Sequence, residues 1–279
     1  MGTTDATVER RAEVMAKLTA GIEALTSSRR WMELLSMQRR FHAYSFNNSL
    51  LIALQCPDAR RVAGFKTWLS LSRSVRKGEK AIWILAPSTR KVEDPETDEA
   101  HSVLTGFRPV PVFDISQTDG EDLPEVASLL SGDDAGLFDR LAMVAARRSL
   151  PLEFADLGST NGQYNCETRV IQINAHRTRA QQAKSLAHEL AHSILHEGGY
   201  AATPRELAEL EAESVAFVVC GIEGLDSGEY SFGYVASWSG GGDKAIAAIK
   251  EVGQRVHDAA NAILSDLGDT DANRAAQAA

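Results

Sequence analysis

Residues 179–199 read RAQQAKSLAHELAHSILHEGG, and this stretch decides the fold of the second half of the chain. Most of its residues favour helices, and Gly198-Gly199 is a typical helix end, so we expect a long helix from about Arg179 to His196. Because one helical turn takes ~3.6 residues, His188 and His192 project from the same face of this helix. The two imidazoles can therefore share a metal ion.

The five residues His188-Glu189-Leu190-Ala191-His192 form the HExxH arrangement that is typical of zinc metallopeptidases. Neutral imidazoles suit Zn²⁺, and a catalytic zinc keeps one position open for water. Glu189 lies beside the pair, where its carboxylate can take a proton from that water. The motif predicts a zinc site with Glu189 as general base. HExxH also occurs by chance in unrelated helices, so the interpretation depends on a third ligand.

The third ligand has several candidates. His196 lies eight residues after His188 and is rotated by ~80° from it, which makes it a poor ligand. A glutamate-rich helix is expected over about Pro204–Val219. In it Glu209 and Glu213 share a face, whereas Glu211 is turned away. Glu211 stays open as an alternative ligand, and so does a simple solvated acidic face.

The spacing of these glutamates resembles the gluzincin-like scheme. In that scheme a glutamate on the second helix is the third ligand, and an acid four residues later orients a ligating histidine through a hydrogen bond. The resemblance implies that Glu209 is the ligand and Glu213 its support. For catalysis, the strand expected at Arg169–Asn174 is a candidate to pair with an extended substrate. Tyr230 and Tyr234 are candidate oxyanion donors.

The charge of the chain is unevenly distributed. Its 279 residues are 44% hydrophobic and carry a formal net charge of −9. Residues 1–117 have a net charge of +4 and residues 118–279 of −13, which indicates two domains with different tasks. We expect an α+β protein: a small mixed nucleic-acid-binding domain at 1–125, a mostly helical zincin-like domain with a short sheet at 126–267, and a disordered tail at 268–279.

Composition excludes several classes of protein. No apolar run approaches the ~20 residues of a membrane-spanning helix, and the N-terminal residues have no signal-peptide pattern. The cysteines Cys56, Cys166 and Cys220 form no CxxC pair, so they predict neither a disulfide framework nor a cysteine zinc site. The expected location is the cytoplasm, with no membrane partner.

The first half of the chain is basic and rich in aromatic residues. Between Arg29 and Lys91 there are 13 Lys and Arg but 3 Asp and Glu, a local net charge of +10. A positive groove with aromatic faces suits unpaired bases, because each base stack is worth roughly 1–3 kcal/mol. This pattern favours single-stranded DNA as a partner. The alternative is that aromatic residues such as Trp68 and Trp83 belong to the core.

Short motifs recur in order between Gln38 and Pro87: Tyr44-Ser45-Phe46-Asn47-Asn48, then Val62-Ala63-Gly64-Phe65-Lys66-Thr67-Trp68, then the run from Val75 to Pro87. This segment resembles the N-terminal domain of ArdC-type antirestriction proteins, which implies single-stranded DNA binding. The ArdC architecture places a zincin-like domain with HExxH after it, and the second half resembles the ImmA/IrrE metallopeptidases. Leu71-Ser72 departs from the family, which has a glycine-containing turn there.

These observations predict a single-stranded DNA-binding protein with a zinc metallopeptidase-like domain, which implies a role in antirestriction or the protection of mobile DNA. One alternative is a DNA-binding protein whose zincin fold is catalytically idle. Another is an ImmA-like regulatory peptidase that cleaves a repressor protein. The residues expected to contact DNA are Arg39, Arg40, Tyr44, Asn47, Asn48, Lys66, Trp68, Arg73, Arg76, Lys77 and Lys80.

Overall fold

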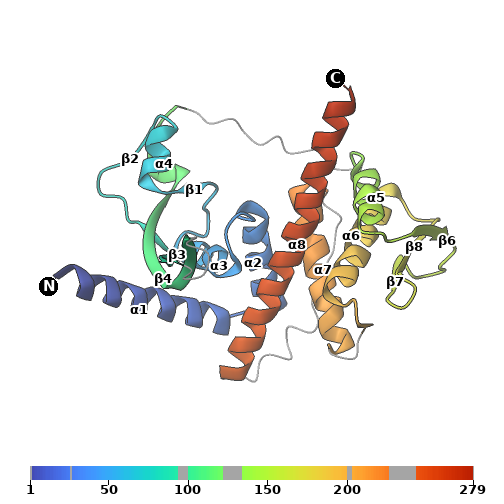
Figure 1. Ribbon diagram of the computed structural model, residues 1–279, viewed down its shortest axis with the longest axis horizontal. Coiled ribbons are helices and arrows are strands. Elements are labelled where there is room, and N and C mark those ends of the chain that lie inside the picture. The colour runs from blue at the N-terminus through green and yellow to red at the C-terminus, as the bar shows by residue number, and fades with distance from the viewer. Residues whose placement is uncertain are drawn as a thin grey trace. The chain divides into compact units, whose positions relative to one another are not determined.

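A computed structural model describes residues 2–25, 27–93, 100–121, 134–199, 203–225 and 243–278 (Figure 1). Its contacts divide the chain into two units: Met1–Glu23 with Asn47–Pro124 (unit 1), and Ala24–Phe46 with Glu125–Ala279 (unit 2). Helices and small sheets occur in both units, which confirms the α+β class. No helix in the described ranges is long and apolar enough to cross a membrane.

Unit 1 is built on a small antiparallel sheet with the strand order β1-β4-β3. Ile82 and Ile84 of β3 are buried, and Ile82 lies opposite the buried Val112 of β4, so alternate residues of the hairpin face the core. A second, two-stranded sheet joins β2 to β5. The elements of this unit are α1 (Gly2–Glu23), α3 (Phe46–Gln55), β1 (Val62–Ala63), α4 (Phe65–Ser70), β2 (Arg73–Val75), β3 (Ile82–Glu93), β4 (Ala100–Asp114), the 3-10 helix η1 (Ile115–Gln117) and β5 (Thr118–Gly120).

Strand β3 lies at the edge of its sheet, and two amide side chains of α3 bind its outer backbone groups. Asn48 contacts the N–H and the C=O of Leu85, each at 2.9 Å, and Gln55 contacts those of Trp83 at 3.1 and 2.9 Å. Pro87 does not end this strand. Strand β3 continues past Pro87 to Glu93, because an edge strand tolerates a residue without an N–H donor.

Unit 2 is mostly helical. Helices α5 and α6 contact a three-stranded sheet of order β6-β8-β7, and α7 and α8 pack against α6 (Figure 1). Strand β8 is parallel to β6 and antiparallel to β7. The elements are α2 (Ser28–Arg40), α5 (Leu137–Arg147), β6 (Leu152–Ala155), β7 (Gly162–Asn165), β8 (Val170–Asn174), α6 (Arg179–Leu195), α7 (Arg205–Ile222) and α8 (Asp243–Ala278).

The structure differs from the expected domain 1–125 because α2 packs in unit 2. Trp31 is fully buried, and its indole Nε1–H donates a hydrogen bond of 2.9 Å to the hydroxyl of Ser214 on α7. Arg39 donates to the carbonyl of Gly221 at the end of the same helix, at 3.1 Å. The apolar face of α2 is therefore part of the core of the second unit.

The expected disordered tail at 268–279 also needs correction. Helix α8 continues to Ala278. Several of its last residues are alanine, which has the strongest helix propensity.

Candidate metal centre

Two helices present the residues of the candidate centre. Helix α6 begins at Thr178, whose hydroxyl accepts a hydrogen bond from the N–H of Gln181, and it carries His188 and His192. Helix α7 begins after Pro204 and carries Glu209. The two helices contact each other, and both carry fully buried alanines, namely Ala183, Ala187 and Ala191 on α6 and Ala208 and Ala212 on α7.

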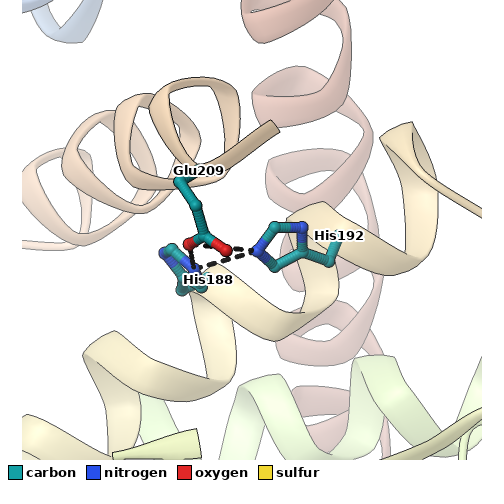
Figure 2. Close-up of side chains that lie close together, drawn as sticks. All are labelled: His188, His192 and Glu209. Atoms are coloured by element: carbon teal, nitrogen blue, oxygen red, sulfur yellow. Dashed lines mark hydrogen bonds and ion pairs between the residues drawn. The ribbon is translucent and has the colours of Figure 1, made fainter. Parts of the chain in front are cut away.

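Three side chains point at one another from these helices (Figure 2). The Nε2 atoms of His188 and His192 are 3.0 Å apart. The Oε2 atom of Glu209 lies 3.3 Å from the His188 Nε2 and 3.7 Å from the His192 Nε2. These three form the group in the described ranges whose ligand atoms all lie within 4.8 Å of one another.

The spacing and the donor set fit a divalent metal. Zinc holds imidazole nitrogens at about 2.0–2.1 Å, so two ligand atoms of a tetrahedral site are separated by about 3.3 Å. The three observed separations of 3.0, 3.3 and 3.7 Å bracket that value. Two imidazoles and one carboxylate also form the ligand set of several catalytic zinc sites.

The electrostatics of the centre favour positive charge. Burial would lower the pKa of His188, but its contacts with Glu209 and Glu213 raise it to about 10. Burial lowers the pKa of His192. Contacts with both histidines hold the pKa of Glu209 well below its usual range. A carboxylate that stays ionised beside two imidazole nitrogens meets the requirement of a cation site.

Glu189 lies at the buried side of an adjoining cleft. Its side chain is almost fully buried, and burial raises its pKa to about 7, although the backbone N–H of Tyr164 opposes the shift. The cleft has a volume of about 400 Å³. At its wall the backbone of Gly162 approaches Glu189 so closely that a Cβ there would lie 3.0 Å from Oε1. The other lining residues are Asn161, Gln181, Lys184, Ser185, His188 and Glu213.

Glu213 lies behind His188. Its Oε2 atom is 3.2 Å from the His188 Nδ1, and its Oε1 atom is 3.2 Å from the ammonium of Lys184. This is the contact that the sequence predicted for Glu213. The lysine holds the carboxylate in place from the other side.

A second set of residues, which the sequence analysis did not predict, lies behind His192. The Nδ1 of His196 is 3.0 Å from the His192 Nδ1, and the Nε2 of His196 is 2.8 Å from Oε2 of Glu211. Glu211 is 0% exposed, and its Oε1 pairs with Arg255 of α8 at 3.1 Å. Glu211 thus contacts His196 and does not join the three ligand atoms. The spacing of His196, four residues after His192, was the available signal.

The candidate substrate strand also changes. Strand β8, expected to pair with an extended peptide, is flanked by β6 and β7 and has no open edge. The strand at the sheet edge beside Glu189 is β7, which the sequence analysis did not predict. Tyr230 and Tyr234 lie outside the described residues.

Several residues expected to contact DNA serve the fold instead. Trp68 is 1% exposed and donates its indole N–H to the carbonyl of Phe113 at 2.9 Å, so its ring is not available for stacking. Arg73 is buried and binds the hydroxyl and carbonyl of Thr118, at 2.8 and 3.1 Å. Asn48 is bound to the backbone of β3.

The remaining expected DNA contacts divide between the two units. In unit 2, Arg39 stacks on the ring of Phe217, Arg40 is exposed, and Tyr44 is half-buried against Phe41. In unit 1, Arg76 is exposed but pairs with Glu79 and Asp119 at 2.8 and 3.3 Å. Asn47 is half-buried, and the exposed cations among the other expected residues are Lys66, Lys77 and Lys80.

Comparison with known families defines the class of protein. Residues 8–113 match the N-terminal domain of anti-restriction factor ArdC, and residues 145–220 match the IrrE N-terminal-like domain of the Peptidase_M78 type. The two matches follow one another along the chain in the order expected, which confirms the resemblance drawn from the sequence.

Individual relatives support the same architecture. Two crystal structures of the antirestriction ArdC protein from the R388 plasmid share the fold. The metal-free one has a TM-score of 0.55 at 22% identity over 80% of this chain and 85% of that one. The Mn(II)-bound one has a TM-score of 0.53 at 21% identity over 81% and 84%.

An uncharacterized protein of Bacillus anthracis, pXO2-81, is 27% identical over 93% of this chain and 51% of its own length. The chain thus spans about half the length of this curated relative.

Proposed function

We propose that unit 2 is a zinc-dependent peptidase domain whose metal is held by His188, His192 and Glu209. The observation that carries the proposal is the convergence of three ligand atoms within 4.8 Å, with the buried Glu189 beside them. The Mn(II)-bound ArdC neighbour supports a divalent metal in this fold. Two imidazoles and one carboxylate, with the glutamate of the HExxH motif beside them, match the ligand set of zinc metallopeptidases.

When bound, the metal supplies a Lewis acid that polarises a carbonyl and makes a water more acidic. Glu189 takes the proton of the attacking water at its carboxylate and delivers it to the leaving amine. Burial raises the pKa of Glu189, which makes its carboxylate a stronger base for accepting that proton. The edge of β7 beside the cleft binds an extended peptide through main-chain hydrogen bonds.

Elemental analysis tests the metal site. The purified protein is expected to hold about one zinc per chain, and His188→Ala removes it. His176→Ala is the matched control, because this histidine of unit 2 is exposed and far outside the ligand set. Zinc that survives His188→Ala, or that is absent from the wild-type protein, contradicts the proposal.

We further propose that unit 1 binds single-stranded DNA. Lys17 of α1 and Lys80 line one hollow of about 600 Å³ in this unit, together with the amide side chains of Gln55 and Gln117. Two ammonium groups suit a phosphate, and the apolar walls suit the face of an unpaired base. The match of residues 8–113 to the ArdC N-terminal domain supports the same partner.

The test compares binding of single- and double-stranded DNA over a range of salt concentrations. The full chain is the correct material, since α2 packs in unit 2 and a cut near residue 125 would remove its neighbours. Tighter binding to the single strand with a steep salt dependence is expected. Equal affinity for both forms, or binding that salt does not change, contradicts the proposal.

Together the two activities fit the protection of entering DNA against restriction. A catalytically idle zincin fold and a regulatory peptidase that cleaves a repressor are the competing functions. Glu189→Gln separates them in cells: protection that survives this change is independent of peptidase chemistry. If one specific protein accumulates in cells that carry Glu189→Gln, that protein is the substrate of a regulatory peptidase.

A further inference from the structure

The two ring nitrogens of His192 face different partners. Its Nε2 atom faces the candidate metal position, 3.0 Å from the His188 Nε2 and 3.7 Å from Oε2 of Glu209. Its Nδ1 atom faces away from that position and lies 3.0 Å from the Nδ1 of His196. Whatever holds Nδ1 therefore fixes both the orientation of the ring and the location of its proton.

The positions of the protons follow from these contacts. A neutral imidazole that offers the Nε2 lone pair to a metal carries its proton on Nδ1. That proton can be donated to His196 only if the Nδ1 of His196 is an acceptor. Neutral His196 then carries its own proton on Nε2, which is 2.8 Å from Oε2 of Glu211. Each contact thus has one donor and one acceptor.

Glu211 is the last residue of this hydrogen-bonded path, and its carboxylate lies in a buried environment that disfavours an ionised group. Its side chain is 0% exposed, and burial of an ionised carboxylate is unfavourable unless the charge is compensated. Arg255 supplies the compensation through the 3.1 Å pair with Oε1. The same guanidinium donates to the carbonyl of Leu195 at 3.2 Å, at the last turn of α6. Helix α8 is thereby joined to the helix that carries both histidines.

We propose that His196, Glu211 and Arg255 are positioning residues that hold His192 in the ring orientation and tautomer required for metal binding. The inference rests on the proposed metal site and adds to it a buried path that reaches α8. His188 has the shorter counterpart, in which Glu213 contacts the ring directly and Lys184 holds the carboxylate. Outer partners of this kind change metal affinity by about 10–100-fold.

The decisive variant replaces both members of the ion pair, Glu211→Leu with Arg255→Met. Removal of one member alone would leave an uncompensated charge, whereas the double change removes the buried carboxylate together with its counter-ion. The Nε2 proton of His196 then loses its acceptor, so the double variant is expected to stay folded with a somewhat lower melting temperature. Its dissociation constant for zinc, measured by competition with a chromogenic chelator, is expected to rise about tenfold or more.

Two further variants keep the test decisive. Glu211→Gln retains an acceptor for His196 without the charge, so its loss of affinity is smaller than that of the double variant. It decides the question alone if the double variant does not fold. Glu206→Gln is the matched control, because it removes a glutamate charge from an exposed position on the same helix. Its affinity for zinc is expected to match the wild type.

The outcomes separate the inference from the proposed function. The inference is overturned if the wild-type protein binds zinc through His188 and the folded Glu211 and Arg255 variants bind zinc with the same affinity. The proposed metal site stands in that case. A wild-type protein that binds no zinc, or whose binding survives His188→Ala, overturns the proposed function itself. Ring ¹⁵N shifts of zinc-loaded protein provide a second readout: a proton on Nε2 of His192 contradicts the path.

Discussion

The two units use their charged and polar side chains in different ways. On α7 of unit 2, Glu209 and Glu213 contact histidines of α6, and Glu211 contacts His196 directly after that helix. Each of the three carboxylates also pairs with a cation. In unit 1, Arg73 and Asn48 bind backbone groups of neighbouring strands. Most of the other lysines and arginines of unit 1 lie at exposed positions, whereas Arg10 and Arg61 are half-buried. Unit 2 therefore gathers its charged side chains in one cluster. Unit 1 uses some of its polar and charged side chains to bind the backbone of its strands.

The difference follows from the size of the elements. Two long helices that pack along their length bring residues four apart into one cluster, so a site can be assembled from helical spacing alone. Short strands leave many backbone groups without a partner in the sheet, and nearby polar side chains must satisfy them. Residue type predicts function well in the first case and poorly in the second.

The largest expected effect is on catalysis in unit 2. Glu189→Gln removes the group that accepts the proton, and general acid–base catalysis contributes about 10²–10⁴-fold to rate. Peptidase activity is expected to fall by this factor while the zinc content stays at one per chain. A comparable fall in zinc content would mean that Glu189 supports the metal rather than the reaction.

The next largest expected effect is a loss of stability in unit 1, and it tests whether the aromatic residues of this unit serve the fold. Trp68→Ala removes a fully buried indole and the hydrogen bond to Phe113, which costs about 3–5 kcal/mol of unfolding free energy. Phe65→Ala is the control on the same helix, since Phe65 is 50% exposed. Its cost is expected to be below about 0.5 kcal/mol. Urea unfolding measures the stability of both variants. Equal unfolding midpoints for Trp68→Ala and Phe65→Ala would contradict the buried position of Trp68.

The sequence predicted that α6 and α7 bring the side chains of the candidate metal centre together, and their role as metal ligands stays a prediction. His188, His192, Glu209 and Glu213 meet because α6 and α7 are regular, and regular helices carry their geometry in residue spacing. It did not predict β7, whose four residues Gly162–Asn165 include no branched aliphatic side chain. Nor did it predict the place of α2, which depends on a contact between Trp31 and Ser214 far along the chain. Long-range packing of that kind leaves no local pattern.

The same limit applies to the basic half. Arg73, Lys77 and Lys80 are equivalent in a count of charge, yet the first is buried and the other two are exposed. Only the packing of β2 against β5 distinguishes them. Composition could therefore indicate a nucleic-acid partner but not the residues that contact it.

A smaller effect sharpens the map of the DNA surface. Each phosphate contact contributes about −0.7 to the slope of log affinity against log salt for a single strand, so Lys77→Ala with Lys80→Ala is expected to flatten the slope by about 1.4. Arg76→Ala is expected to leave it unchanged, because Glu79 and Asp119 already pair with that guanidinium. Salt titrations of the three proteins measure the slopes. If Arg76→Ala flattens the salt slope and the double lysine variant does not, Arg76 rather than the two lysines contacts DNA.

The smallest expected effect is a pH dependence in unit 1. Asp114 is buried, which would raise its pKa, but hydrogen bonds from the N–H groups of Ser116, Arg60 and Arg61 lower it overall. A lowered pKa in the folded state contributes stability above the unfolded value of about 3.9, and this contribution is lost as the pH falls through the folded pKa.

Asp114→Asn removes that titration. The variant is expected to be less stable than the wild type at pH 7, and the gap in urea midpoint is expected to close below about pH 3.9. Other carboxylates titrate in both proteins, so the difference between the two midpoints isolates Asp114. If the difference in urea midpoint stays constant between pH 7 and pH 3, the charge of Asp114 does not contribute to the stability of η1. Unit 1 would then use its charges less than the comparison with unit 2 implies.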